Sequence, residues 1–315
     1  MRIVLRILCV ALIACLVFLV AGVLATWEPD RSVKRLEARW ATAPSQFIDV
    51  AGMQVHLRDE GPRDDPVPIV LLHGTADSLH TWEGWTQALK SQRRVVRFDL
   101  PGFGLTGPHP QNDYSIESYT RFVTQVVNAM GIQSFVLAGN SLGGHIAWAT
   151  AIALPSRVSS LILVDAAGYP QKSVSVPIGF RLAKTPIVRD ALAYVLPRGV
   201  VQSSVRNVYG DPSRVTPELV DRYFEMTLRT GNRIATGQRF AQAVQGDSAV
   251  IKTLRLPVLI LWGGKDLLIP LENAKLFEAD IAASKLVVFD ALGHVPQEED
   301  AQATVQEVRK FLSSL

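Results

Sequence analysis

The chain has 315 residues, of which 48% are hydrophobic and 19% charged, and its formal net charge is +3. Its 22 glycines and 18 prolines are too few for a collagen-like or low-complexity disordered protein. The two cysteines, Cys9 and Cys15, both lie in the first apolar stretch, which excludes disulfides, thiolate zinc sites and a catalytic cysteine from the rest of the chain.

An apolar segment of 20 residues, Ile7 to Thr26, follows two N-terminal arginines. About 20 apolar residues span a bilayer core as a helix, whereas the apolar region of a secretory signal is typically about 7–15 residues long. We therefore predict that residues 1–27 form an uncleaved transmembrane signal anchor. A long signal peptide that is cleaved after Ala25 is the alternative.

The orientation of this anchor is harder to predict, because basic residues flank it on both sides. A positive-inside count would place the large domain in the cytoplasm. A short basic head before a single N-terminal apolar segment is typical of export signals, however, and large domains translocate largely regardless of charge. We predict a single-pass protein of the inner (cytoplasmic) membrane with a periplasmic domain. Residues 28–44 are predicted to be a juxtamembrane linker with a short amphipathic helix along Val33, Leu36 and Trp40.

From residue 47 onward, short apolar segments alternate with helical patterns. Phe47–Val50 and Met53–Arg58 are predicted to form a hairpin, with its turn at Ala51-Gly52. Further strands are expected at 69–73, 95–98, 135–139, 161–165, 258–262 and 286–289, and helices at 116–130, 142–153, 271–281 and 301–312. Short apolar strands separated by helices indicate a mostly parallel sheet that is covered on both faces. We therefore predict an α/β core that comprises residues 45–166 and 246–315.

Residues 167–245 interrupt this alternation and are predicted to form a helical lid. This segment has 11 basic and 5 acidic residues, a net charge of +6. Basic side chains near an anionic membrane surface contribute about 1 kcal/mol each, so the lid could contact lipid headgroups; solvated helix faces are the alternative. Nucleic acid is not expected as a partner, because the overall charge is small and no recognition motif is present.

The strongest motif is Gly139-Asn140-Ser141-Leu142-Gly143, which lies between an apolar strand and a helix. This context is required for a nucleophile elbow, in which small neighbours let the strand and helix approach and a sharp turn exposes the serine hydroxyl. A serine hydroxyl is a weak nucleophile unless a base activates it. We predict that Ser141 is the nucleophile.

Six histidines could supply the base. His294 follows the last predicted strand in a loop before the final helix, and we predict that it is the base. His145 lies one helical turn beyond Ser141, so a packing role is expected for it. His56, His80 and His109 have no supporting sequence context, and surface or packing roles are expected for them as well.

The third predicted member of the site is an acid that orients the imidazole. Asp266 follows the strand at 258–262, so nucleophile, acid and base occur along the chain in the order Ser, Asp, His. Asp165 also ends a strand and is the competing acid. Asp290 lies too close to His294 in sequence to be preferred.

At these residues the chain resembles the α/β-hydrolase superfamily, and the resemblance extends over residues 45–315. It is carried by Leu72-His73-Gly74-Thr75, Asp99–Gly104, the serine motif, Leu261–Asp266 and Gly293-His294. The resemblance implies that the backbone N–H groups of Thr75 and Leu142 form an oxyanion hole and that His73 is structural. It implies neither a cofactor nor a metal ion.

The identity of the nucleophile narrows the expected function. Epoxide hydrolases and haloalkane dehalogenases carry an aspartate at the elbow, which leaves esters, lipids, thioesters and the carbon–carbon bond of meta-cleavage products. Hydrolases of the last group often share the Gly-Asn-Ser-x-Gly motif, but the aromatic residue that follows their histidine is replaced here by Val295.

With its predicted anchor, the chain resembles membrane-anchored bacterial esterases and phospholipases. A serine hydrolase that cleaves acyl esters or lipids through an acyl-enzyme is therefore expected. A carbon–carbon bond hydrolase and a non-enzymatic binding protein of the same fold are the alternatives, and a homodimer is compatible with the sequence.

Overall fold

The computed structural model describes the chain except for residues 1, 171, 186–187, 190–193 and 244–246. Eight strands form one sheet in the order β1-β2-β4-β3-β5-β6-β7-β8. Strand β2 runs antiparallel to β1 and β4, and the other neighbouring strands are parallel. The strands are β1 (Ser45–Val50), β2 (Met53–Glu60), β3 (Ile69–Leu72), β4 (Val95–Phe98), β5 (Phe135–Asn140), β6 (Val158–Val164), β7 (Val258–Gly263) and β8 (Ser284–Phe289).

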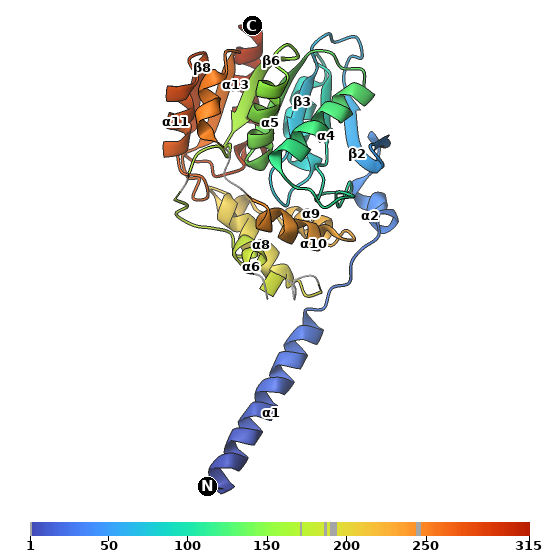
Figure 1. Cartoon of the computed structure of the whole chain (residues 1–315), viewed down its shortest axis with the longest axis vertical. Coiled ribbons are helices and arrows are strands. Elements are labelled where there is room, and N and C mark those ends of the chain that lie inside the picture. The colour runs from blue at the N-terminus through green and yellow to red at the C-terminus, as the bar shows by residue number, and fades with distance from the viewer. Residues whose placement is uncertain (1, 171, 186–187, 190–193, 244–246) are drawn as a thin grey trace.

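Helices cover both faces of this sheet (Figure 1). One face packs against α4 (Ile116–Ala129), α5 (Leu142–Ala153) and α11 (Glu272–Asp280), and the other against α3 (Glu83–Leu89) and α13 (Ala301–Ser313). Alternate residues of a strand enter opposite clusters: Val70 and Leu72 lie in the first, and Ile69 and Leu71 in the second. The predicted mostly parallel α/β architecture is confirmed.

The predicted hairpin at β1 and β2 is present, and its turn residues Ala51 and Gly52 have φ angles of 53° and 79°. Helix α3 was not predicted from the sequence. It has only seven residues and contains Gly84, so it is too short to show a helical period. It is positioned by packing instead, because Trp85 and Leu89 are buried against the sheet.

A helical insertion lies between β6 and β7. It contains α6 (Ile178–Lys184), α8 (Arg198–Val208), α9 (Pro217–Thr227), α10 (Asn232–Ala241) and a short 3-10 helix at Ser248–Thr253. The predicted end of the lid at residue 245 falls outside the described residues. Val201, Val205, Val220 and Phe224 form an apolar cluster within the insertion, which is closed on the core side by Val295.

The N-terminal helix α1 (Arg2–Ala25) is long and apolar enough to cross a membrane. Figure 1 shows it as an isolated rod that leaves the molecule on the side of the insertion. The predicted amphipathic helix is also present as α2 (Val33–Trp40), with Leu36 buried at 2% exposure.

The segment between α1 and the core, residues 26–41, binds to the insertion, which the sequence did not predict. The guanidinium of Arg31 donates to Glu225 at 2.6 Å, and its backbone N–H donates to the carbonyl of Leu228 at 2.6 Å. The ring of Trp27 stacks on that of Tyr194 at 5.8 Å. The insertion is therefore tied directly to the chain that leaves α1.

Candidate active site

Ser141 connects β5 to α5 in a strained conformation. Its φ and ψ angles are 55° and −115°, in a region that costs a residue other than glycine about 1–3 kcal/mol. Backbone hydrogen bonds hold it there, because its N–H donates to Val164 O at 3.0 Å and its carbonyl accepts from Ala167 N at 3.0 Å. The sharp turn predicted at the motif is thus present.

The two glycines of the motif are required by close backbone contacts. A Cβ atom at Gly139 would collide with the backbone of Gly143, and one at Gly143 would collide with the carbonyl of Leu72. Neither residue can carry a side chain without separating α5 from the strands beneath it. The motif therefore places the first turn of α5 directly against the end of the sheet.

His294 and Asp266 lie together at the same edge of the sheet. His294 Nδ1 is 2.7 Å from Asp266 Oδ2, and both residues are at most 5% exposed. The other carboxylate oxygen of Asp266 accepts from the N–H groups of Leu268 and Ile269 at 2.8 and 2.9 Å. These bonds fix the carboxylate so that it orients the imidazole.

The backbone of His294 is also held by neighbouring segments. Its N–H donates to Val208 O at the end of α8 at 2.7 Å, and its carbonyl accepts from Asn140 Nδ2 at 2.9 Å. Asn140 directly precedes the serine, so one side chain joins the nucleophile elbow to the histidine loop. The insertion thus contributes to the position of this loop.

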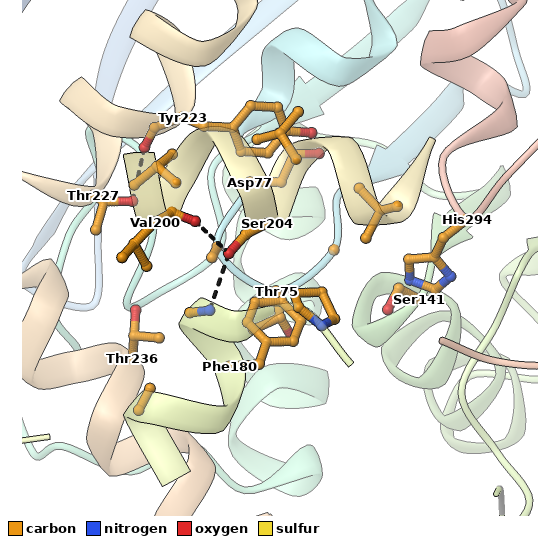
Figure 2. A pocket seen from close by; sticks show the side chains of 18 of the residues that line it. Thr75, Asp77, Ser141, Phe180, Val200, Ser204, Tyr223, Thr227, Thr236 and His294 are labelled. Atoms are coloured by element: carbon orange, nitrogen blue, oxygen red, sulfur yellow. Dashed lines mark hydrogen bonds between the residues drawn. The ribbon is translucent and has the colours of Figure 1, made fainter. Parts of the chain in front are cut away.

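Ser141 and His294 line one pocket, and Figure 2 shows their side chains next to each other at one end of it. The pocket contains about 1080 Å³ of empty space, part of which is open to solvent. Much of its wall is apolar and is supplied by the insertion. These apolar residues are Pro177, Phe180, Ala183, Leu196, Val200, Val201, Val205 and Val208, together with Val295 from the core.

The sequence predicts an oxyanion hole formed by the backbone N–H groups of Thr75 and Leu142, and the structure describes the surroundings of both residues. Leu142 is the first residue of α5, so its N–H has no acceptor within the helix. Thr75 lines the pocket, and Gly74 beside it leaves room for the elbow, since a Cβ there would lie 3.2 Å from Ser141 Cβ. Such donors stabilise the negative charge that develops during acyl transfer.

Asp165, the competing acid, lies close to both Asp266 and His294. One oxygen of Asp165, one of Asp266 and a ring nitrogen of His294 lie within 4.8 Å of one another. By distance alone this grouping could hold a metal ion. Asp165 Oδ1 accepts from Gly263 N at 2.9 Å and Asp266 Oδ2 is bound to the imidazole, whereas Asp165 Oδ2 is buried and has no hydrogen-bond partner among the described residues.

Burial and the charge of Asp266 raise the pKa of Asp165 well above its usual range. The raised pKa favours the neutral carboxylic acid, a form that can donate a hydrogen bond to Asp266. The imidazole of His294 is hydrogen-bonded to Asp266, the acid that the sequence favoured over Asp165.

The remaining histidines lie outside the pocket-lining residues. His145 stacks on Trp148 at 4.6 Å, and His73 is buried, with its Nε2 accepting from Leu100 N at 2.9 Å. His80 Nε2 is hydrogen-bonded to Trp40 O at 2.9 Å. These packing and structural arrangements agree with the roles expected from the sequence.

Another serine–histidine–aspartate set, which was not predicted from the sequence, lies away from the pocket. His56 Nδ1 is 2.7 Å from Asp99 Oδ2, and His56 Nε2 is 2.9 Å from Ser45 Oγ. The pairing of β2 with β4 brings the histidine and the aspartate together, since Asp99 N donates to His56 O at 2.9 Å. To predict this contact from the sequence, one would have to predict which residue of β2 lies opposite which residue of β4.

A buried charged cluster connects the insertion to the core near the pocket. Arg222 of α9 binds Glu298 at 2.5 Å and Asp77 at 3.6 Å, and the hydroxyl of Tyr209 donates to Glu298 at 2.7 Å. Burial, together with the charge of Glu298, raises the pKa of Asp77 to about 7. Asp77 follows the Gly74-Thr75 segment closely, so this cluster links α9 to the predicted oxyanion loop and to the short helix after His294.

Known proteins resemble this chain over most of its length. A sequence model of the family described as "alpha/beta hydrolase fold" matches residues 67–301. The 2-hydroxy-6-oxo-2,4-heptadienoate hydrolase of Pseudomonas putida is 29% identical over 280 residues, which cover 85% of this chain and 96% of that protein.

Solved structures show the same likeness. A meta-cleavage product hydrolase from Pseudomonas fluorescens IP01 matches with a TM-score of 0.74 at 26% identity and covers 85% of this chain and 97% of its own. A membrane phospholipase A matches with a TM-score of 0.73 at 23% identity and covers 99% of this chain and 98% of its own. At 23% identity, the match to the membrane phospholipase A shows a shared fold.

Proposed function

This chain belongs to the α/β-hydrolase family, and from that premise we propose that it is a membrane-anchored serine hydrolase that cleaves carboxylic esters. The arrangement at the pocket carries the proposal. Ser141 is strained and lines an apolar pocket beside His294, whose imidazole is bound to Asp266 at 2.7 Å. A non-enzymatic relative would need none of these features together.

In the proposed reaction, Ser141 Oγ attacks the carbonyl carbon of the ester and gives its proton to His294 Nε2. The N–H groups of Thr75 and Leu142 hold the oxyanion of the tetrahedral intermediate. His294 then donates the proton to the leaving alcohol, and an acyl-enzyme forms on Ser141. Water attacks this ester with the same base, and the carboxylic acid and free serine are released.

Acyl lipids are the proposed substrate class. The valines of α8 and Phe180 of α6 give the pocket an apolar wall that suits an acyl chain. In this proposal α1 anchors the enzyme in the inner membrane as a single span, the catalytic domain is periplasmic and the insertion serves as a lid. The basic residues of the insertion would then face anionic headgroups.

A carbon–carbon bond hydrolase is the second candidate, because meta-cleavage product hydrolases are among the relatives at 26–29% identity. The same serine, histidine and aspartate would serve that reaction. The replacement of the aromatic residue after the histidine by Val295 and the apolar α1 helix favour the ester reaction.

Activity of the detergent-solubilised full chain tests the proposal. Its substrates would be p-nitrophenyl esters of increasing chain length, a phospholipid and a 2-hydroxy-6-oxo-dienoate, with Ser141→Ala as the control. Ser141-dependent release of p-nitrophenol or fatty acid supports the ester reaction. Turnover of the dienoate alone would assign the chain to the second candidate.

A further inference from the structure

The pocket has two chemically different ends. Ser141 and His294 lie at one end, and Figure 2 shows Thr227 and Thr236 on the opposite side. Val200 and its neighbours on α8 contribute apolar wall to the same pocket. A substrate that reaches both ends therefore crosses apolar surface before it meets polar groups.

Arg233 lines the pocket on the threonine side. It lies on α10, three residues before Thr236 and therefore on a neighbouring part of the helix face. Its side chain is only 6% exposed, and its Nε and Nη2 bind Asp30 Oδ1 at 3.2 and 2.6 Å. The third guanidinium nitrogen, Nη1, is buried and has no hydrogen-bond partner among the described residues. A buried donor of this kind requires an acceptor, which a ligand can supply.

A second guanidinium borders the same helix face. Arg189 also lines the pocket, and its Cδ atom would lie 2.6 Å from a Cβ atom at Gly237, one turn after Arg233. The absence of a side chain at Gly237 therefore gives Arg189 its place beside α10. Among the described lining residues, Asp77 is the acidic one, and it is paired with Arg222 at 3.6 Å.

We propose that Arg233 forms an anion-binding subsite on the side of the pocket away from Ser141. The ligand group would be the phosphate or carboxylate of an ester whose apolar part lies along α8. A guanidinium matches both anions through charge-assisted hydrogen bonds. Asp30 orients Arg233, so the segment after α1 contributes to the subsite. The inference rests on the proposed ester hydrolysis and narrows its substrates to amphipathic anionic esters.

Competitive inhibition tests this subsite. The full chain in detergent would hydrolyse p-nitrophenyl butyrate in the presence of n-octyl phosphate, nonanoate or 1-octanol, which share an apolar chain and differ in charge. We expect at least one anion to have an inhibition constant about tenfold or more below that of octanol, as is typical of charge-assisted bonds. The ratio of the inhibition constant of octanol to that of the anion is the quantity to compare. Arg233→Gln should reduce this ratio to about one, and Arg233→Lys should retain part of it because a cation remains.

The ratio is measured within each variant, so a change in overall activity does not enter it. Arg198→Gln is the matched control: Arg198 pairs with Asp221 on the exposed side of the insertion and does not line the pocket. It should keep the wild-type ratio. Preference for octyl phosphate would indicate a lipid headgroup, and preference for nonanoate an acid-bearing ester.

An unchanged ratio in Arg233→Gln, or equal inhibition by all three compounds in the wild type, would overturn the subsite. Calorimetric titration of octyl phosphate into Ser141→Ala measures binding without turnover. If no ester is hydrolysed but that titration shows Arg233-dependent binding, the subsite stands and the proposed reaction fails. If esters are hydrolysed but no anion is preferred over octanol, the proposed reaction stands and the subsite fails.

Discussion

Two serine–histidine–aspartate sets occur in this molecule, and their histidine–aspartate distances are both 2.7 Å. In the first set, His56 and Asp99 are completely buried, and Ser45 Oγ also accepts from Arg58 Nε at 2.9 Å. No residue of this set lines a pocket among those described. In the second set, the serine is strained and borders an apolar pocket.

The difference between the two sets shows that hydrogen-bond geometry alone does not define a catalytic site. Asp99 serves as a structural centre, because its oxygens accept from Leu79 N and Leu105 N, both at 2.7 Å, as well as from His56. The second set adds what the first lacks: a pocket beside the serine and the histidine, and a helix that begins directly after the serine. We therefore expect substitutions in the second set to lower activity and substitutions in the first set to lower stability.

Replacing the two serines should give the largest contrast. Ser141→Ala should lower kcat on p-nitrophenyl esters by about 10⁵–10⁶, the loss typical of a removed serine nucleophile. Ser45→Ala should leave kcat within about twofold, because Ser45 has no route to substrate. Steady-state kinetics on both variants measure this, and a large loss in Ser45→Ala would contradict the assignment.

The two aspartates should separate activity from stability. Asp266→Asn should lower kcat by about 10⁴, since the amide favours the wrong histidine tautomer. Asp99→Asn should instead lower the melting temperature, because three donors lose a charged acceptor. Kinetics below the melting point of each variant, with calorimetry beside them, distinguish the two outcomes.

The pH dependence of stability sharpens the contrast at Asp99. Burial alone would raise the pKa of Asp99, but the neighbouring His56 imidazole holds this pKa below its usual range. The unfolded chain therefore binds this proton more readily, and the stabilising contribution is present above about pH 4 and is lost as the pH falls. Asp99→Asn should flatten the acid side of the stability profile, as followed by melting temperature against pH. An unchanged acid side would contradict this role.

Much of the second set could be predicted from the sequence, because Ser141 and Asp266 each follow a parallel strand and His294 follows the last strand. The carboxyl ends of parallel strands meet at one edge of the sheet, so local patterns were sufficient to bring these residues together. The first set depends on the register of β2 against β4, which local patterns do not encode.

Two other features required tertiary information. The contact of Asp30 and Arg31 with the insertion joins residues about 200 positions apart, which no local pattern indicates. The net charge of the insertion suggested a basic surface, but Arg198, Arg222 and Arg233 form ion pairs within the protein. Its contact with anionic lipid therefore remains a prediction.

A smaller effect is expected at Asp165. Asp165→Asn should lower kcat less than about tenfold, because the amide can still donate to Asp266 and accept from Gly263 N. Asp165→Val should cost more, since it leaves both partners without a bond in a buried place. If Asp165→Asn equals Asp266→Asn in its loss of kcat, the orienting acid has been misassigned.

The smallest expected effects are on stability at the two serines, and they have opposite signs. Ser45→Ala should destabilise the fold by about 1 kcal/mol, because His56 and Arg58 lose a partner. Ser141→Gly should stabilise it by up to about 1 kcal/mol, because glycine adopts a φ of 55° without strain. Denaturant unfolding measures both changes, and equal signs would show that strain is not concentrated at Ser141.

Site mapping with a fluorophosphonate probe tests the central claim most directly. The probe reacts with an activated serine, and peptide mass spectrometry then locates the adduct in the full chain. We predict a single adduct on Ser141, none on Ser45, and no labelling of Ser141→Ala. An adduct on Ser45, or equal labelling of wild type and Ser141→Ala, would contradict the account.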